Sequence, residues 1–413
     1  MTRLGIVTSG FPYTPKETFL APELHELSSA ADVFVYPVTP KTGRIHSTAT
    51  NAALPVHMPL ASAHVIAEAA REFVERPARV ARAFRAVVAG PSWKVRVKNA
   101  AVFAKALAVA RDMRRRRIQH VHAYWASTPA TVAYAVAMLN DIPWSFTAHR
   151  WDIYENNLLA DKVRHAVFVR AISERARATV LERVDPAYAH KVTALHLGVA
   201  RASTFAFESA RPFTVLCAAN LEPVKGHSTL IRALRLLAER GIDVRCVLAG
   251  DGSLRGGLED AVRAGGLSHR VTFAGAVPHK TLLHDLASGA YDVAVLASIE
   301  TKAGLHEGIP AFLMEAMAAG VPCIATRTGS IAELIDDRCG VLVEQRDAQA
   351  LADAIERLAH DGATRRALGR AACARVARDF AAETLACRLL AQMQVQDSAA
   401  MRREIAELTS ARS

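Results

Sequence analysis

Two glutamates that lie eight positions apart have the spacing in this chain that points most directly to chemistry. Glu307 precedes Gly308, and Glu315 lies inside the apolar run that follows. Pro310 and Gly320 predict a helix of about ten residues between them, because a helix accepts Pro at its first position and commonly ends before Gly. The other side chains of this helix leave no polar face, so the pattern predicts a buried helix that carries one carboxylate. An unpaired buried carboxylate is costly, and we therefore expect Glu315 to face a cation or the hydroxyl groups of a ligand.

The start of the same helix is suited to bind an anion. Its first backbone N–H groups, near Gly308 and Ile309, have no partner within the helix and lie at the positive end of the helix dipole. The carboxylates of Glu307 and Glu315 flank this position and can accept hydrogen bonds from hydroxyl groups. A ligand with both phosphate and vicinal hydroxyl groups fits the pattern, and a nucleotide-sugar has both.

The two glutamates, set around Gly-Ile-Pro and before Ala-Gly-Val-Pro, resemble the E-x7-E motif of family-4 retaining glycosyltransferases. The alternative, a helix with a satisfied buried glutamate, is disfavoured because the Pro, Gly and strand signals of the motif accompany it. The resemblance extends over nearly the whole chain and implies the GT-B fold, an α/β architecture of two Rossmann-like doubly wound domains facing a cleft. It also implies that Glu315 holds the ribose, Glu307 the sugar hydroxyls, and the amides of Gly308 and Ile309 the diphosphate.

A lysine and a glycine follow the first strand expected in the second half of the chain. A lysine beside glycine at a helix N-terminus can neutralise a diphosphate as a mobile point charge. Lys225 and Gly226 resemble the family's R/N-x4-K-G loop, with Asn220 where many relatives have Arg, so Lys225 is expected to carry more of the charge. Gly252 lies in a Gly-Asp-Gly turn that resembles the family's G-x-G loop. The expected donor-binding residues are Asn220, Lys225, Gly226, Gly252, Glu307, Gly308, Ile309, Pro310 and Glu315.

Polar residues also follow two strands expected in the first half. The segment 118–125 is expected to be a strand that ends in a polar cluster with His122 and Trp125. His149 and Asp152 come directly after the strand 143–147, where an open parallel sheet places ligand-binding groups. A lone histidine is more often structural, but T-A-H-x-x-D-I-Y resembles the family's post-strand His loop. The resemblance favours a role for His149 near the reacting carbon, with Asp152 orienting it. The candidate catalytic residues are His149, Glu307 and Lys225.

The first loop of the chain departs from the family pattern. Many relatives have a Gly-Gly pair after the first strand, whereas this chain has Ser9-Gly10-Phe11-Pro12 and continues to Glu17. A glycine at this edge of a sheet commonly lets a ligand approach the backbone. The lack of the Gly-Gly pair, however, argues against direct contact between this loop and a phosphate. The expected acceptor-binding residues are Gly10, Glu17, His122, Trp125, His149 and Asp152.

Length and composition indicate two domains. A chain of 413 residues with 51% hydrophobic and 6% aromatic residues suits two α/β cores, and the alternation of strands and helices restarts near Phe213. We expect an acceptor-binding domain at 1–205, a nucleotide-sugar-binding domain at 206–378, a helix at 379–395 that crosses back to the first domain, and a tail at 396–413.

Several classes of protein are disfavoured by what the sequence lacks. No segment reaches about 18 uninterrupted apolar residues and no leader pattern is present, so we expect a cytoplasmic protein. The six cysteines are dispersed without a C-x-x-C pair, which favours reduced core residues over disulfides or zinc ligands. No Asp-x-Asp motif occurs, so no metal and no cofactor is expected, and the nucleotide-sugar is a substrate.

The positive charge is concentrated in one half of the chain. Residues 1–200 hold 26 basic and 15 acidic side chains, whereas the remainder holds 25 of each, so the first half accounts for the net charge of +11. The segment 64–117 is rich in Arg and has helical, amphipathic periodicity. It is either an ordinary solvated surface or a surface that docks on an anionic membrane leaflet. No nucleic-acid-binding motif accompanies the charge, so we expect an anionic or lipid-linked saccharide acceptor and peripheral contact with the inner membrane face as a further option.

The function predicted from the sequence is transfer of a hexose, with retention, from a UDP- or GDP-linked sugar to an acceptor in polysaccharide, glycolipid or glycoside biosynthesis. Two alternatives stay open. One is a nucleotide-sugar 2-epimerase on the same architecture, which needs no acceptor. The other is a relative that binds an anionic ligand without activity, which the retained Lys225, Glu307 and Glu315 disfavour.

Overall fold

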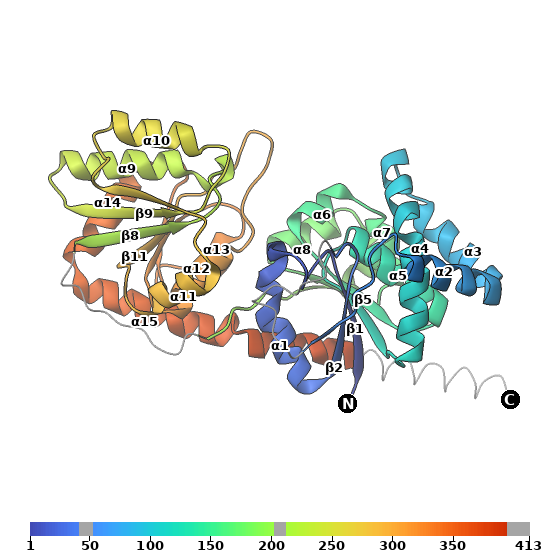
Figure 1. Ribbon diagram of the computed structural model, residues 1–413. Coiled ribbons are helices and arrows are strands. Elements are labelled where there is room, and N and C mark those ends of the chain that lie inside the picture. Colours follow the sequence, from blue (N-terminus) through green and yellow to red (C-terminus); the bar gives the residue numbers. More distant parts are fainter. Residues whose placement is uncertain (41–52, 202–211, 395–413) are drawn as a thin grey trace. The chain divides into compact units, whose positions relative to one another are not determined.

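The computed structural model describes residues 1–40, 53–201 and 212–394 (Figure 1). Within these ranges the chain forms two compact units: unit 1 contains Met1–Gly198 and the chain from Ala382, and unit 2 contains Val199–Ala381. The domain boundary expected at 205/206 and the expected tail 396–413 lie outside the described residues.

Unit 1 is built on a parallel sheet of seven strands in the order β3-β2-β1-β4-β5-β6-β7. Most of its central strands are buried throughout, because helices cover both faces of the sheet. The order runs outward from β1 in one direction and then restarts at β4 on its other side, so β1 and β4 flank the topological switch point. The strands are β1 (Arg3–Thr8), β2 (Asp32–Pro37), β3 (Leu54–Pro55), β4 (His120–Ala123), β5 (Trp144–Ala148), β6 (Phe168–Ala171) and β7 (Val192–Ala194).

The helices of unit 1 divide between the two faces of its sheet. On one face, α1 contributes Leu24 and Leu27 to a core shared with Leu4 and Ile6 of β1. On the other face, the helices α4 and α5 pack on a larger core that includes Val7 and Val121. The helices are η1 (Pro15–Leu20), α1 (Ala21–Ala30), α2 (Ala63–Glu75), α3 (Pro77–Val88), α4 (Trp93–Arg115), α5 (Thr128–Asn140), α6 (Arg150–Glu155), α7 (Leu159–His165), α8 (Glu174–Leu181) and η2 (Pro186–Lys191).

Unit 2 repeats the same winding on six parallel strands, in the order β10-β9-β8-β11-β12-β13. Its switch point lies between β8 and β11, and helices cover both faces of the sheet, with α9 and α10 on one and α11 and α12 on the other (Figure 1). The strands are β8 (Phe213–Ala218), β9 (Val244–Ala249), β10 (Val271–Gly275), β11 (Val293–Leu296), β12 (Cys323–Thr326) and β13 (Val341–Val343). The helices are η3 (Pro223–Lys225), α9 (His227–Glu239), α10 (Arg255–Ala264), α11 (His279–Ala287), α12 (Ala311–Ala318), α13 (Ile331–Leu334), α14 (Ala348–His360) and α15 (Gly362–Asp379). Two doubly wound α/β domains are therefore present, as the sequence predicted.

The chain returns to unit 1 after α15. Phe380 leaves the helical conformation, Ala381 forms an isolated parallel bridge with Val199, and residues 382–394 are helical again. Leu385 and Leu389 of this last helix are buried in the core that lies over α1 and β1. The returning helix therefore begins after a break at 380–381 instead of at 379. In the described residues, no helix combines the length and apolar character that crossing a membrane requires.

Candidate functional site

In unit 2, a cation and an anion face each other across the switch point. Lys225 follows β8 and Glu307 lies in the loop between β11 and α12, and the Lys225 ammonium lies 2.5 Å from Oε1 of Glu307. The contact is within ion-pair distance, but Oε1 receives no hydrogen bond of good geometry. Both side chains are largely buried yet reach solvent, with 22% and 11% of their surfaces exposed. The sheet thus brings together two of the predicted residues at the edge where doubly wound sheets bind ligands.

Two glycines fix the backbones that carry this pair. Gly226 has φ +67°, and a Cβ there would lie 1.8 Å from the carbonyl oxygen of Ala297, just beyond β11. Gly329 has φ +58°, and a Cβ there would lie 2.0 Å from the carbonyl oxygen of Glu307. Only glycine fits such contacts, because other residues add a side-chain atom and disfavour positive φ. The backbones of the loops that carry Lys225 and Glu307 are therefore in close contact with residues at neighbouring strand ends, which fixes their positions.

The Gly-Asp-Gly turn, which contains Gly252, packs at the same edge of the sheet. A Cβ on Gly252 would lie 2.6 Å from the carbonyl oxygen of Leu221, and Leu221 N donates to the carbonyl oxygen of Asp251 at 3.0 Å. The turn therefore packs against the loop after β8. Asn220, at the start of that loop, is exposed. The predicted Gly252 and Asn220 thus lie in adjoining loops.

The helix between the two glutamates is buried as predicted, and Glu315 is its partly exposed carboxylate. Pro310 is the N-cap of α12, one residue before the first helical position predicted for it. Gly308 is half-buried, and a Cβ there would meet nothing within 4 Å, so space adjoins the backbone at the helix start. Ile309 is half-buried beside it. The carboxylate of Glu315 lies 2.8 Å from Nε2 of His279, and this hydrogen bond raises the pKa of His279.

Two histidines near this edge were missed by the sequence analysis. His279 begins α11, and no short-range signal connects it with a glutamate 36 residues away. His227 begins α9 directly after Gly226, and among the described residues neither of its ring nitrogens has a hydrogen-bond partner. Burial, followed by the charge of Lys225, lowers the pKa of His227 to about 4, so this ring is neutral at pH 7. The only sequence signal for a role of His227 was its position directly after Lys225 and Gly226.

In unit 1, the predicted acceptor residue Glu17 binds the protein's own backbone. Its carboxylate accepts hydrogen bonds from the amides of Ser9 (3.1 Å), Gly10 (2.6 Å) and Phe11 (2.7 Å), and from Nε1 of Trp125 (2.5 Å). Glu17 is 4% exposed. Its carboxylate thus fills the loop after β1 where a phosphate would need these amides, and it also holds Trp125. The contact of Glu17 with an acceptor stays a prediction. Gly10 is likewise buried within this loop.

His149 lies against the same tryptophan. The rings of Trp125 and His149 stack with centroids 4.1 Å apart, and Phe19 meets His149 edge-on at 5.9 Å. In the described part of the chain Nε2 of His149 has no hydrogen-bond partner, although the residue is only 6% exposed. Burial, followed by the charge of Arg170, lowers the pKa of His149 to about 3, so the imidazole is neutral across the physiological range. A neutral imidazole with an unpaired nitrogen can serve a hydroxyl group as acceptor or donor.

Asp152 contacts His149 through a capping box at the start of α6, and His122 is hydrogen-bonded inside the sheet. The carboxylate of Asp152 accepts from the backbone amides of His149 (2.7 Å) and Ala126 (2.5 Å), so it braces two loops. The backbone amide of Asp152 in turn donates to the His149 side chain, which helps to orient the imidazole. His122 is fully buried in β4, with Nδ1 2.8 Å from the Ser145 hydroxyl and Nε2 2.8 Å from the Thr147 hydroxyl. Both ring nitrogens of His122 are therefore occupied inside the sheet, and its contact with an acceptor stays a prediction.

Residues 203–375 match the family model described as "Glycosyl transferases group 1". The amylovoran biosynthesis glycosyltransferase AmsK of Erwinia amylovora is 35% identical over 149 residues, which cover 36% of this chain and 36% of that relative. A GDP-mannose-dependent α-(1-6)-phosphatidylinositol monomannoside mannosyltransferase of Mycobacterium tuberculosis is 32% identical over 190 residues, 45% of this chain and 48% of that relative. The matches thus span less than half of the length of each of these two relatives.

Solved structures show the fold over nearly the whole chain. Anabaena HepE in complex with UDP has a TM-score of 0.70 at 17% identity, covering 96% of this chain and 100% of that one. Sucrose-phosphate synthase from Thermosynechococcus elongatus has a TM-score of 0.70 at 19% identity, covering 97% and 100%. At these identities the likeness establishes the fold, which is the GT-B fold that the sequence predicted.

Proposed function

We propose that this chain is a retaining glycosyltransferase that transfers a hexose from a UDP- or GDP-linked sugar to a saccharide acceptor. The observation that carries the proposal is the Lys225–Glu307 pair at the switch point of unit 2, 2.5 Å apart beside the start of α12. A cation, a carboxylate and a helix N-terminus at this edge suit a ligand that combines a diphosphate with hydroxyl groups. The group 1 match over 203–375 includes all three features.

In the proposed donor complex, Lys225 and the amides of Gly308 and Ile309 bind the diphosphate. The diphosphate competes with Glu307 for the Lys225 ammonium, and the Glu307 carboxylate then becomes available to hydroxyl groups of the sugar. Glu315 binds the ribose hydroxyls from the partly exposed side of α12. Donor binding and the rearrangement of the ion pair are therefore coupled, because one cation serves two anions in turn.

The proposed chemistry consists mainly of positioning and charge neutralisation. The leaving diphosphate gains negative charge as the glycosidic bond breaks, and Lys225 with the α12 N-terminus stabilises that charge without a divalent metal. His149, neutral and with Nε2 unpaired, contacts a hydroxyl of the transferred sugar or of the acceptor. Trp125 holds its ring in place by stacking at 4.1 Å.

The acceptor proposed is an anionic or lipid-linked saccharide of polysaccharide or glycolipid biosynthesis, reached in the cytoplasm or at the inner membrane face. The family match and the relatives named above support this class, and the relatives' own substrates differ from one another. The 2-epimerase alternative has no structural observation in its favour.

The test begins with the donor, because donor binding needs no knowledge of the acceptor. The melting temperature of the protein is measured with UDP, with GDP and with their hexose conjugates. One of the two nucleotides should raise it and the other should not. The selected nucleotide-sugar is then incubated with the protein alone and with candidate acceptors. A 2-epimer formed from donor alone would favour the epimerase, and stabilisation by none of the nucleotides would favour an inactive binding protein.

A further inference from the structure

Helix α2 buries two glutamates beside Val65 and Ala69, and it turns a stripe of apolar side chains outward. The side chains of Glu68 and Glu72 are buried, with 4% and 0% exposed. The opposite face consists of residues at the i, i+3, i+4, i+7 spacing of one helical stripe, and all of them are exposed. We call this face the α2 stripe, and its residues are Ala63, Ile66, Ala67, Ala70, Phe73 and Val74.

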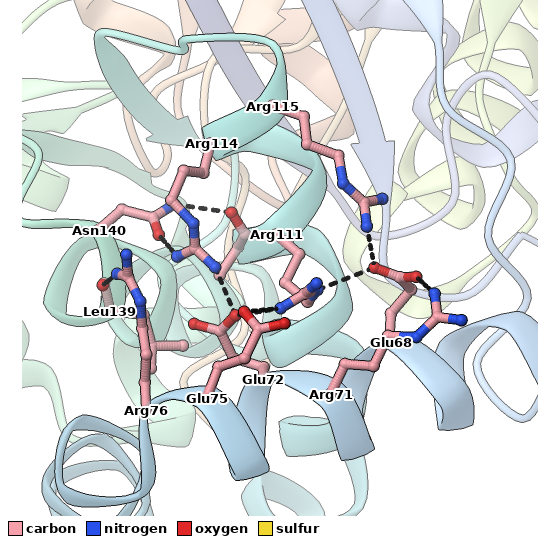
Figure 2. A network of polar contacts seen from close by, with 11 residues as sticks. Glu68, Arg71, Glu72, Glu75, Arg76, Arg111, Arg114, Arg115, Leu139 and Asn140 are labelled. Atoms are coloured by element: carbon pink, nitrogen blue, oxygen red, sulfur yellow. Dashed lines mark hydrogen bonds and ion pairs between the residues drawn. The ribbon is translucent and has the colours of Figure 1, made fainter.

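Ion pairs to α4 hold α2 in this orientation (Figure 2). Glu68 pairs with Arg111 at 2.9 Å and with Arg115 at 2.7 Å, and Glu72 pairs with Arg111 and Arg114. Rotating the helix to bury the α2 stripe would leave these arginines and carboxylates without their partners, and separating a buried ion pair is costly. The outward stripe is therefore a fixed feature of unit 1.

The α2 stripe exposes three large apolar side chains to water. Ile66 is 61% exposed, Phe73 57% and Val74 77%. Single exposed apolar residues need no explanation, but a contiguous apolar stripe commonly marks a surface that another body covers.

The ion pairs also determine which basic side chains of the Arg-rich segment 64–117 remain without an acidic partner within the ranges that the structure describes. Arg111, Arg114 and Arg115 are neutralised by the α2 carboxylates, and Arg79 pairs with Asp141. Among the described residues, four exposed basic side chains on the neighbouring helices have no carboxylate within ion-pair distance: Arg82 and Arg85 of α3, and Lys94 and Arg96 at the start of α4. Trp93, 70% exposed, precedes Lys94. The helices α2, α3 and α4 pack against one another at one end of unit 1 (Figure 1).

We propose that the α2 stripe docks on an anionic lipid bilayer, with Arg82, Arg85, Lys94 and Arg96 held by lipid headgroups. An apolar helical face with basic residues and an exposed tryptophan nearby is the combination that binds at a membrane interface. Anionic lipid complements this positive charge, whereas a second copy of the chain would bring the same positive charge to the interface. The bilayer is therefore favoured over self-association.

The experiment is co-sedimentation of the full chain with vesicles of phosphatidylcholine mixed with phosphatidylglycerol, and with vesicles of phosphatidylcholine alone. The wild type should pellet with the mixed vesicles only. The Ile66→Ser/Phe73→Ser variant should lose binding roughly tenfold or more, while Leu54→Ser, at another exposed apolar residue of unit 1, should bind like the wild type. Because the altered side chains are exposed, an unchanged melting temperature is expected and checks the fold.

The charge is tested by a second matched pair. Arg82→Gln/Arg85→Gln should weaken binding to the mixed vesicles about tenfold, while Arg366→Gln/Arg370→Gln, which removes two exposed arginines of α15 in unit 2, should not. Equal binding to both vesicle types, equal losses in test and control variants, or no binding by the wild type would overturn the proposal. So would self-association in ultracentrifugation that the Ile66→Ser/Phe73→Ser variant abolishes. The proposal does not rest on the proposed function, because the vesicle experiments contain no nucleotide and the nucleotide affinity is measured separately.

Discussion

Nε2 of His279 lies 2.8 Å from Oε1 of Glu315, so the carboxylate proposed to bind the ribose is hydrogen-bonded to an imidazole from the neighbouring helix α11. Glu315 is 14% exposed and His279 35%. The hydrogen bond holds the carboxylate in one orientation at the edge of α12. It also makes the charge of this edge depend on pH, because the contact raises the pKa of His279.

The first prediction concerns stability and pH. Since the folded pKa of His279 lies above its unfolded value, the pair stabilises the fold fully below about pH 6.5, and this contribution disappears as pH rises through the folded pKa. His279→Gln should therefore lower the free energy of unfolding more at about pH 5.5 than at about pH 8.5. The difference should be at most about 1 kcal/mol, because the pair is partly exposed. Urea unfolding at both pH values measures it, and an equal loss at each would contradict the assigned pair.

The second prediction concerns the ribose. Glu315→Gln keeps an oxygen that accepts from His279 but removes the charge that strengthens hydrogen bonds to hydroxyl groups. The variant should bind the preferred ribonucleotide about tenfold more weakly, and its 2′-deoxy analogue with a smaller loss. Calorimetry with both nucleotides gives the two ratios. Equal losses would remove Glu315 from the ribose.

The local features of the site were predictable because they depend on neighbours in sequence. Gly320 has φ +74° and ends α12, with Val321 N donating to the carbonyl oxygen of Ala316, as Ala-Gly-Val-Pro predicted. The strand order placed the loops of Lys225 and Glu307 together, and this follows from the parallel winding that the alternation of strands and helices predicted.

The long-range pairings could not be predicted, since no short-range pattern encodes them. Glu17 reaches Trp125 across 108 positions, and its carboxylate binds loop amides that could otherwise hold an anion. Periodicity predicted amphipathic helices in 64–117, but it cannot indicate that α2 is anchored through Glu68 and Glu72. The ion pairs of Glu68 and Glu72 with α4, together with the burial of Val65 and Ala69, fix this orientation.

The third prediction concerns stereochemistry. The proposed mechanism places Lys225 and a helix N-terminus behind the leaving diphosphate, and no pair of carboxylates is assigned as nucleophile and acid as in double displacement. The product should keep the anomeric configuration of the donor, and EDTA should leave the rate within about twofold. NMR of the product during early turnover determines the configuration. An inverted product, or activity that EDTA abolishes and manganese restores, would contradict the mechanism.

The last prediction tests the Lys225–Glu307 pair by a double-mutant cycle. Lys225→Met should weaken nucleoside diphosphate binding by roughly 2 to 4 kcal/mol, because it removes the cation from the diphosphate and leaves the Glu307 carboxylate beside it. Glu307→Gln alone should strengthen diphosphate binding slightly, since Lys225 no longer has a competing anion. The double variant should recover part of the loss, and Lys302→Met, at an exposed lysine of the β11–α12 loop, should bind like the wild type. Calorimetry with the diphosphate measures all four. Wild-type affinity in Lys225→Met would show that the diphosphate binds elsewhere.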